Sequence, residues 1–212
     1  MKKFLLAATA AATAFAVAPA ANAATFIVSG GTYTPVPTVQ PGANDFHTEL
    51  AALGFSHELI SANVQVSGEA WIYFEVLGSE SGYNDTFTYG TTSFSENTGF
   101  TPWTSISLAP VYTNGIGNFL GQFTSSEGTA AGQGDIGFAV FVPTGGGNFS
   151  SNTIYFGYDD IPGGDDNHDD LIIKATIVAV PEPATWALMI AGVAAVGVSM
   201  RRRSKNVRVA FS

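Results

Sequence analysis

Apolar residues at every second position constrain the fold of this 212-residue chain more than any other feature. The alternation runs through four segments in the middle of the chain, at residues 60–66, 72–76, 136–142 and 154–158. Successive side chains of a strand point to opposite faces, so this period of two predicts half-buried β-strands. A nearly continuous apolar run at residues 171–180 predicts one further strand that is buried on both faces.

Turns rich in glycine and asparagine separate these runs, for example at residues 78–84, 113–115 and 145–147. Short strands divided by such turns predict an all-β fold, a single jelly-roll-like β-sandwich of about eight or nine strands. One short helix is expected at residues 45–53, between an asparagine cap and a glycine. The β-sandwich domain is expected to cover residues 24–180.

The N-terminus has the basic, apolar and small-residue parts of a secretory signal peptide. Two lysines precede an apolar run at residues 4–18, and the small residues Ala21 and Ala23 follow it. Signal peptidase is expected to cleave after Ala23, so that the signal peptide covers residues 1–23. A retained N-terminal membrane anchor is the alternative, but the apolar run is shorter than the roughly 20 residues of a full span.

A second membrane-directed segment lies at the C-terminus. Its features are Pro181, Glu182, Pro183, Trp186 and Ala187, an apolar stretch at about residues 184–200, and a basic end at residues 201–208 that begins with Arg201, Arg202 and Arg203. The apolar stretch is near the lower length limit for a membrane span, and its basic end is retained on the cytoplasmic side. A transient transmembrane helix is therefore expected.

The proline, glutamate, tryptophan and arginine pattern of residues 181–212 resembles the PEP-CTERM sorting signal in its PEPxxWA form. This resemblance implies recognition by an exosortase, a membrane protease, during a stage at the inner membrane. It further implies removal of the tail and delivery to the cell envelope, the cell surface or the extracellular space. Proteins with this signal occur in bacteria that make exopolysaccharide, so exopolysaccharide and a biofilm matrix are implied partners. An ordinary C-terminal membrane anchor is the alternative.

The segment between the two signals is strongly acidic. Residues 24–180 contain sixteen acidic residues and a single basic one, Lys174, which gives a formal charge of −15. Such a charge excludes nucleic acid as a natural partner, because phosphates are bound by Lys and Arg. It is compatible with cation binding and equally with simple solubility. The chain has no cysteine, so neither disulfides nor a thiol nucleophile is available.

The densest chemical feature is an acidic segment at residues 159–170, directly before the last expected strand. Its carboxylates repel one another, and calcium is the obvious counter-ion for an exported protein because it takes about six to eight oxygen ligands. The expected calcium ligands are Asp159, Asp160, Asp165, Asp166, Asn167, Asp169 and Asp170. The alternative is that these side chains only cap backbone amides in a turn. His168 is expected to be hydrogen-bonded or solvated, because zinc would need more His or Cys ligands nearby.

The acidic segment carries a second resemblance. Residues 156–160 and 166–173 are similar to the C-terminal motif of DUF4114-type domains, and residues 77–87 also look like such exported proteins. His168 and Asp169 stand where tyrosine and asparagine are commoner in that motif. The resemblance implies a β-sandwich and no settled activity.

No catalytic motif stands out, because the chain has neither a nucleophile elbow nor a phosphate-binding loop. Glu69 and Glu75 could form a glycosidase pair. Trp71, Trp103 and the tyrosines could stack on sugar rings, although each is more often part of the core or of a turn. The sequence favours a non-enzymatic structural or adhesive protein of the envelope or matrix. An extracellular carbohydrate-binding module is the alternative, and a secreted glycoside hydrolase comes third.

Overall fold

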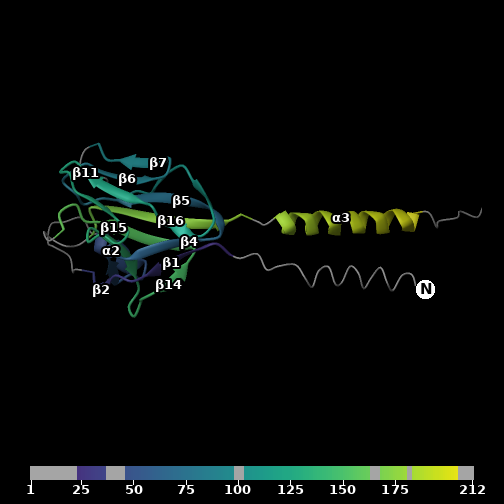
Figure 1. The fold of residues 1–212 in the computed structure, drawn as a ribbon, viewed down its shortest axis with the longest axis horizontal. Coiled ribbons are helices and arrows are strands. Elements are labelled where there is room, and N and C mark those ends of the chain that lie inside the picture. The colour runs from purple at the N-terminus through teal and green to yellow at the C-terminus, as the bar shows by residue number, and fades with distance from the viewer. Residues whose placement is uncertain (1–22, 37–45, 98–102, 163–167, 181–182, 205–212) are drawn as a thin grey trace, which may run out of the picture. The chain divides into compact units, whose positions relative to one another are not determined.

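A computed structural model of the chain describes residues 23–36, 46–97, 103–162, 168–180 and 183–204 (Figure 1). The strands form one compact unit over Ala23–Ala179, and helix α3 (Pro183–Ser204) lies outside that unit. Several residues with expected roles fall outside the described parts of the chain, namely the signal peptide up to position 22 with Ala21, the proposed ligands Asp165, Asp166 and Asn167, and the sorting residues Pro181 and Glu182.

The described part of the domain is built from strands and one short helix, α2 (Phe46–Ala52). The strands are β1 (Thr25–Ser29), β2 (Thr32–Pro35), β3 (His57–Ile60), β4 (Asn63–Ser67), β5 (Glu69–Gly78), β6 (Asp85–Tyr89), β7 (Thr92–Ser95), β8 (Ile106–Ser107), β9 (Val111–Asn114), β10 (Gly117–Asn118), β11 (Gln122–Ser125), β12 (Ala130–Gly132), β13 (Phe138–Val142), β14 (Phe149–Ser151), β15 (Thr153–Tyr158) and β16 (Leu171–Ala179). The predicted all-β class is confirmed. The strands outnumber the eight or nine expected because many of them are only two to four residues long.

The strands form three antiparallel sheets. The largest has the order β2-β3-β13-β15-β16-β5-β8, with β9 also pairing with β5. The second has the order β10-β4-β1-β14 and the third β12-β11-β6-β7. The long strand β16 is central to the largest sheet, with β15 on one side and β5 on the other. Its first three residues are fully buried, as the apolar run predicts, but burial then alternates and Val178 is 49% exposed, so the strand is buried on both faces only at its start.

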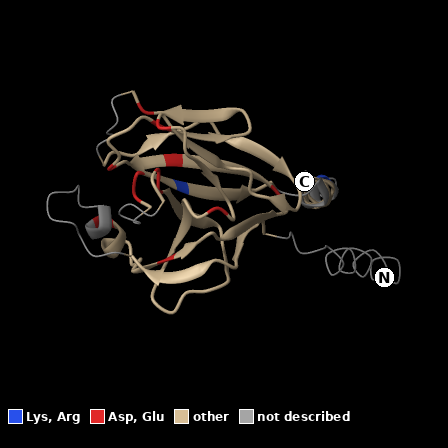
Figure 2. Cartoon of the chain, turned by 60° about the vertical axis from the view of Figure 1, so that its left-hand side comes forward, with Lys and Arg blue, Asp and Glu red and all other residues tan. Residues whose placement is uncertain are grey.

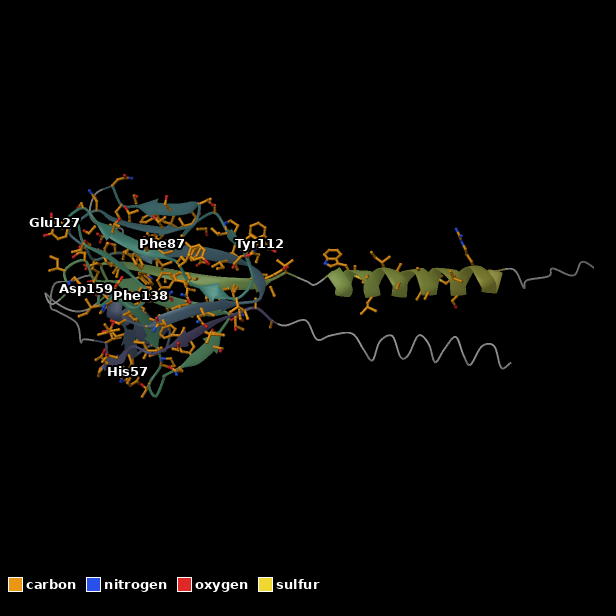
Figure 3. All side chains as sticks on the ribbon, in the orientation of Figure 1. His57, Phe87, Tyr112, Glu127, Phe138 and Asp159 are labelled. Carbon is orange, nitrogen blue, oxygen red and sulfur yellow. The ribbon has the colours of Figure 1, made fainter. Side chains whose placement is uncertain are left out.

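One aromatic core joins the inner faces of the sheets. The ring of Phe87 on β6 lies 5.7 Å from the ring of Phe156 on β15 and 5.2 Å from Phe123 on β11. Phe119 brings in the second sheet through its edge contact with Phe26 on β1, at 6.2 Å. Figure 3 shows Phe87 and Phe138 within the layer of side chains between the strands. Such aromatic pairs add specific geometry to apolar burial, so they hold β6 and β15 in a fixed relation.

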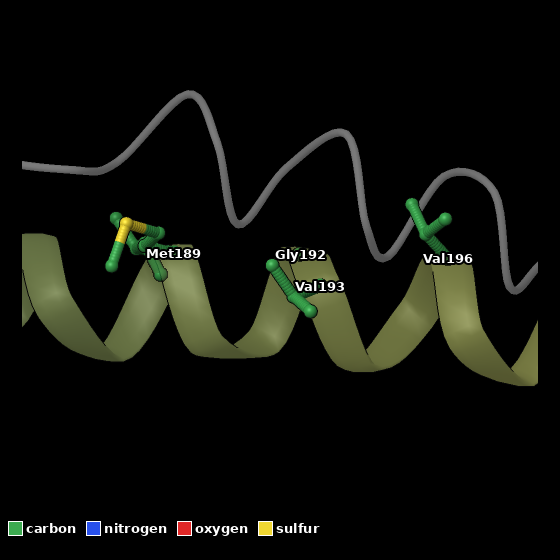
Figure 4. Close-up of a pocket in the computed structure, with 5 residues that line it drawn as sticks. Met189, Gly192, Val193 and Val196 are labelled. Atoms are coloured by element: carbon green, nitrogen blue, oxygen red, sulfur yellow. The ribbon is translucent and has the colours of Figure 1, made fainter.

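The C-terminal helix corrects one expectation. No helix in the described residues is long and apolar enough to cross a membrane, so the transmembrane segment expected at about residues 184–200 is not supported. The physical reason is composition, because alanine and glycine occupy much of α3 and arginines fill its last turn. One apolar face of α3 forms the pocket in Figure 4, which is lined by Leu188, Met189, Gly192, Val193 and Val196.

Candidate functional site: a buried carboxylate cluster

The acidic segment closes the hairpin of β15 and β16. Tyr158 and Leu171 are the last paired residues of the two strands, and the N–H of Asp170 donates to the carbonyl of Tyr158 at 3.0 Å. Asp159 and Asp160 directly follow the last paired residue of β15, and Asp170 directly precedes the first paired residue of β16. Antiparallel pairing thus brings carboxylates from both ends of the segment to one place. Figure 3 shows Asp159 at this end of the domain.

Asp159, Asp160 and Asp170 form a cluster of carboxylates that is almost closed to solvent. One oxygen from each of the three lies within 4.8 Å of the others. The exposed fractions of these residues are 0%, 4% and 9%. Charged carboxylates so close together repel one another by a few kcal/mol, roughly 4 at this distance near a protein surface. A cation or bound protons must offset this repulsion.

Hydrogen bonds hold the three carboxylates in place. Ser81 Oγ donates to Asp160 Oδ2 at 2.7 Å, and the N–H of Asp160 donates to Asp170 Oδ2 at 2.7 Å. The N–H of Ile161 donates to Asp159 Oδ1 at 2.8 Å, which is a turn-capping bond of the kind expected as the alternative. Each bond engages one oxygen of its carboxylate. Capping and cation binding are therefore compatible at this site.

Burial and mutual repulsion keep protons on the cluster. Burial raises the pKa of Asp170 to about 9, and the charges of Asp160, Asp169 and Asp85 add to the rise against the N–H of Asp160. An aspartic acid with such a pKa carries its proton at neutral pH. Without a cation, the cluster is therefore stabilised by protonation.

Asp85, the first residue of β6, is a fourth buried carboxylate next to the cluster. Its exposed fraction is 0%, and neither carboxylate oxygen makes a hydrogen bond of good geometry. Burial raises the pKa of Asp85 to about 7, and the charges of Asp160 and Glu96 add to the rise. Hydroxyl groups of Ser125 and Ser81 lie near enough to oppose that rise. No spacing in the sequence places Asp85 beside the acidic segment, although residues 77–87 resemble other exported proteins.

His168 lies beside the cluster in a separate buried pair. Its Nδ1 is 3.2 Å from Glu58 Oε2, and its Nε2 donates to the carbonyl of Ile136 at 2.8 Å. Burial lowers the pKa of His168, but the Glu58 carboxylate outweighs burial, and the net shift is upward. Both ring nitrogens are engaged, so His168 is hydrogen-bonded as expected. Its backbone carbonyl packs against Gly157, where a Cβ atom would overlap it.

Asp169 is buried but does not belong to the group of three close carboxylates. Its backbone carbonyl accepts a hydrogen bond from the N–H of Glu80 at 3.2 Å, which ties the acidic segment to the loop after β5. Of the seven expected ligands, the structure thus brings together Asp159, Asp160 and Asp170. The expected roles of Asp165, Asp166 and Asn167 lie outside the described residues.

Comparison with known proteins decides what the C-terminal segment is. Residues 179–203 match the PEP-CTERM protein-sorting motif. The chain carries a PEP-CTERM sorting motif. No curated protein and no solved structure matches the chain.

The PEP-CTERM match begins at the last residue of β16 and contains every sorting residue expected from the sequence, Pro181, Glu182, Pro183, Trp186, Ala187, Arg201, Arg202 and Arg203. This motif implies processing by an exosortase, which is a membrane protease. A protein that carries this motif is exported and passes the membrane for sorting.

A second candidate surface lies on the outer face of β5. The side chains of Trp71, Tyr73 and Tyr112 are 43%, 43% and 44% exposed, and the rings of Trp71 and Tyr112 lie 5.4 Å apart across β5 and β9. Trp103 lies elsewhere, because it packs against the small apolar cluster around Leu50. Figure 3 shows Tyr112 at the end of the domain opposite Asp159.

The glutamates of β5 do not form a glycosidase pair. Glu69 and Glu75 are six residues apart on one strand, which is roughly 20 Å. Glycosidase carboxyls lie only about 5–10 Å apart. Glu75 instead pairs with Lys174 on the neighbouring strand, with a shortest N–O distance of 3.1 Å. Figure 2 marks the acidic residues of the described chain in red and the basic ones in blue.

Proposed function

We propose that this PEP-CTERM protein is a non-enzymatic structural or adhesive component of the cell envelope or extracellular matrix, with a calcium ion bound at its carboxylate cluster. The observation that carries the calcium site is the convergence of Asp159, Asp160 and Asp170 within 4.8 Å in a nearly closed environment. The positive charge of the ion offsets the repulsion among the three side chains.

The donor atoms favour calcium over other common metals. The cluster offers carboxylate oxygens, which are the hard ligands that calcium prefers, and the neighbouring His168 is already engaged through both ring nitrogens. Zinc sites usually contain His or Cys, and magnesium demands a stricter octahedral geometry. Extracellular calcium modules typically bind with dissociation constants of about 10⁻⁴–10⁻³ M, which suits an exported protein.

A calcium ion at this place has a structural role. It would fasten the closing segment of the β15–β16 hairpin, and this hairpin forms the centre of the largest sheet together with β5. A domain without cysteine gains from such a cross-link outside the cell, where disulfides often serve that purpose. The remaining acidic surface keeps the displayed domain soluble.

Isothermal titration with calcium tests this proposal on the exported protein. Wild type is expected to bind one calcium ion in the range of about 10⁻⁴–10⁻³ M or tighter, with weaker binding of magnesium. Asp160→Asn is expected to weaken calcium binding at least about tenfold, since even loss of an outer partner costs about that much. Glu127→Gln removes one exposed charge of the domain and should leave the affinity unchanged. Equal affinity in all three proteins would contradict the site.

A carbohydrate-binding role is the second candidate, and the exposed aromatic row of Trp71, Tyr73 and Tyr112 favours it. Rings presented side by side on a sheet face can stack on sugar rings. Retention on the exporting organism's own polysaccharide that is lost in Trp71→Ala but kept in Tyr33→Ala would favour this role. Tyr33 is a suitable control because it is similarly exposed and stacks on His57 on other strands.

A further inference from the structure

We infer that Asp85 is a fourth ligand of the cation, so that the ion joins two different sheets. This inference rests on the calcium site proposed above. The other three carboxylates close the β15–β16 hairpin of the largest sheet, whereas Asp85 begins β6 of the β12-β11-β6-β7 sheet. Nothing in the sequence spacing connects Asp85 with the acidic segment, because more than seventy residues separate them.

The loop before Asp85 lies directly on the acidic segment. Ser81 Oγ donates to Asp160 Oδ2 at 2.7 Å, and Glu80 N–H donates to the carbonyl of Asp169 at 3.2 Å. Ser81 Oγ also accepts the N–H of Tyr83 at 2.9 Å, which tightens the turn that leads into β6. Two anchoring residues within five positions of Asp85 therefore contact the acidic segment.

The turn after β11, the strand that pairs with β6, also contacts the acidic segment. Asp85 pairs with Ser125 in the ladder between β6 and β11. The turn that follows Ser125 contains Thr129, whose Oγ1 donates to the carbonyl of Asp160 at 2.6 Å. The hydroxyl of Tyr158 lies 2.8 Å from the same Oγ1. Asp160 is therefore contacted from both sides of Asp85. Ser81 lies before Asp85 in the chain, and Thr129 follows Ser125, the ladder partner of Asp85.

The state of the Asp85 side chain points to a ligand. A carboxylate that is fully buried and lacks a good hydrogen bond is costly unless a proton or a cation neutralises it. The charge of Asp160 acts on Asp85, and the charge of Asp85 in turn acts on Asp170, although Asp85 stands outside the three carboxylates whose oxygens lie within 4.8 Å of one another. Calcium accepts four carboxylates together with water or carbonyl oxygens, since it takes about six to eight ligands.

A cation bound by Asp85 as well as by the hairpin carboxylates acts as a clip between two sheets. A site confined to the hairpin would stabilise only the pairing of β15 with β16. A site that includes Asp85 also ties β6 to the hairpin, so that calcium stabilises the β12-β11-β6-β7 sheet as well.

Thermal melting of the exported protein in chelator and in millimolar calcium tests this inference with Asp85→Asn and the exposed control Glu127→Gln. In chelator, Asp85→Asn is expected to melt at or above wild type, because one buried negative charge is gone. In calcium, it is expected to lose most of the rise in Tm shown by wild type, with calcium affinity reduced at least about tenfold. Glu127→Gln should match wild type under both conditions.

Two results would overturn the role of Asp85. If Asp85→Asn binds calcium with wild-type affinity, Asp85 is not a ligand, but the site formed by the hairpin carboxylates is unaffected. If calcium changes neither the Tm nor the binding signal of wild type, both the hairpin site and the role of Asp85 are refuted. Amide hydrogen exchange on wild type gives a measurement that does not depend on the variant folding. Calcium should slow exchange at Thr86 and Phe87 as well as in the hairpin, and slowing in the hairpin alone would refute the clip.

Discussion

In chelator, the protein is expected to lose stability as the pH rises from about 5 to about 9. Asp85 and Asp170 have pKa values of about 7 and about 9 in the folded protein, both above the ordinary value of 3.8. Between those values the folded state binds more protons than the unfolded state, so the free energy of unfolding falls with rising pH. The contribution is complete below about pH 4 and is lost as the pH passes about 7 and then about 9.

The size of this loss should be easy to measure. Each unit of pKa shift corresponds to about 1.4 kcal/mol, and with an allowance for water and salt the two groups together give a loss on the order of 5 kcal/mol. That is comparable with the whole stability of a marginal domain, about 5–15 kcal/mol. Scanning calorimetry in chelator at pH 5, 7 and 9 should therefore give falling Tm values.

Calcium is expected to remove or reverse this pH dependence. The ion binds ionised carboxylates, so its affinity increases as Asp85 and Asp170 lose their protons. Sodium chloride at moderate concentration serves as the control, since it screens exposed charges much better than buried ones. Asp170→Asn should flatten the profile in chelator. A flat profile for wild type in chelator would show that the buried carboxylates do not control stability.

Glu182→Ala is expected to leave the sorting tail attached to the protein. Glu182 is the acidic residue of the PEP-CTERM match and stands between two prolines, which restrict the backbone around it. The substitution removes the negative charge of Glu182 and with it part of the segment that the protease recognises. Nearly all of the variant should remain at its unprocessed mass in the membrane fraction, as measured by cell fractionation and mass spectrometry.

Thr185→Ala provides the matched control for the sorting prediction, because position 185 is one of the two variable positions of the PEPxxWA pattern. This variant should be processed like wild type. Processing and release of Glu182→Ala at the wild-type level would contradict recognition of the motif by an exosortase.

Alternating apolar residues predicted the strands of the core. Phe74 and Val76 are buried on β5, and Val64 and Val66 are buried on β4, as a period of two requires. The pattern failed at Ile136, which is 61% exposed because it lies in the turn before β13 rather than in the strand. Edge strands of two residues, such as β8 and β10, could not be predicted because a period of two has no meaning over that length.

The candidate site was predictable only where charge density marks it. Asp159, Asp160 and Asp170 stand out because they lie in one acidic segment, and the hairpin then brings them together. Asp85 is a single aspartate at the start of a strand, so only the tertiary contacts of the loop before it reveal its place. Long-range packing of this kind leaves no periodic signal in the sequence.

A crystal structure of the exported protein grown in millimolar calcium tests the central claim most directly. The expected result is one calcium ion between Asp159, Asp160, Asp170 and Asp85, with carboxylate oxygens about 2.3–2.6 Å from it. A structure from the same calcium-containing crystals in which the four side chains contact one another through hydrogen bonds, with no ion between them, would contradict a calcium-stabilised cluster.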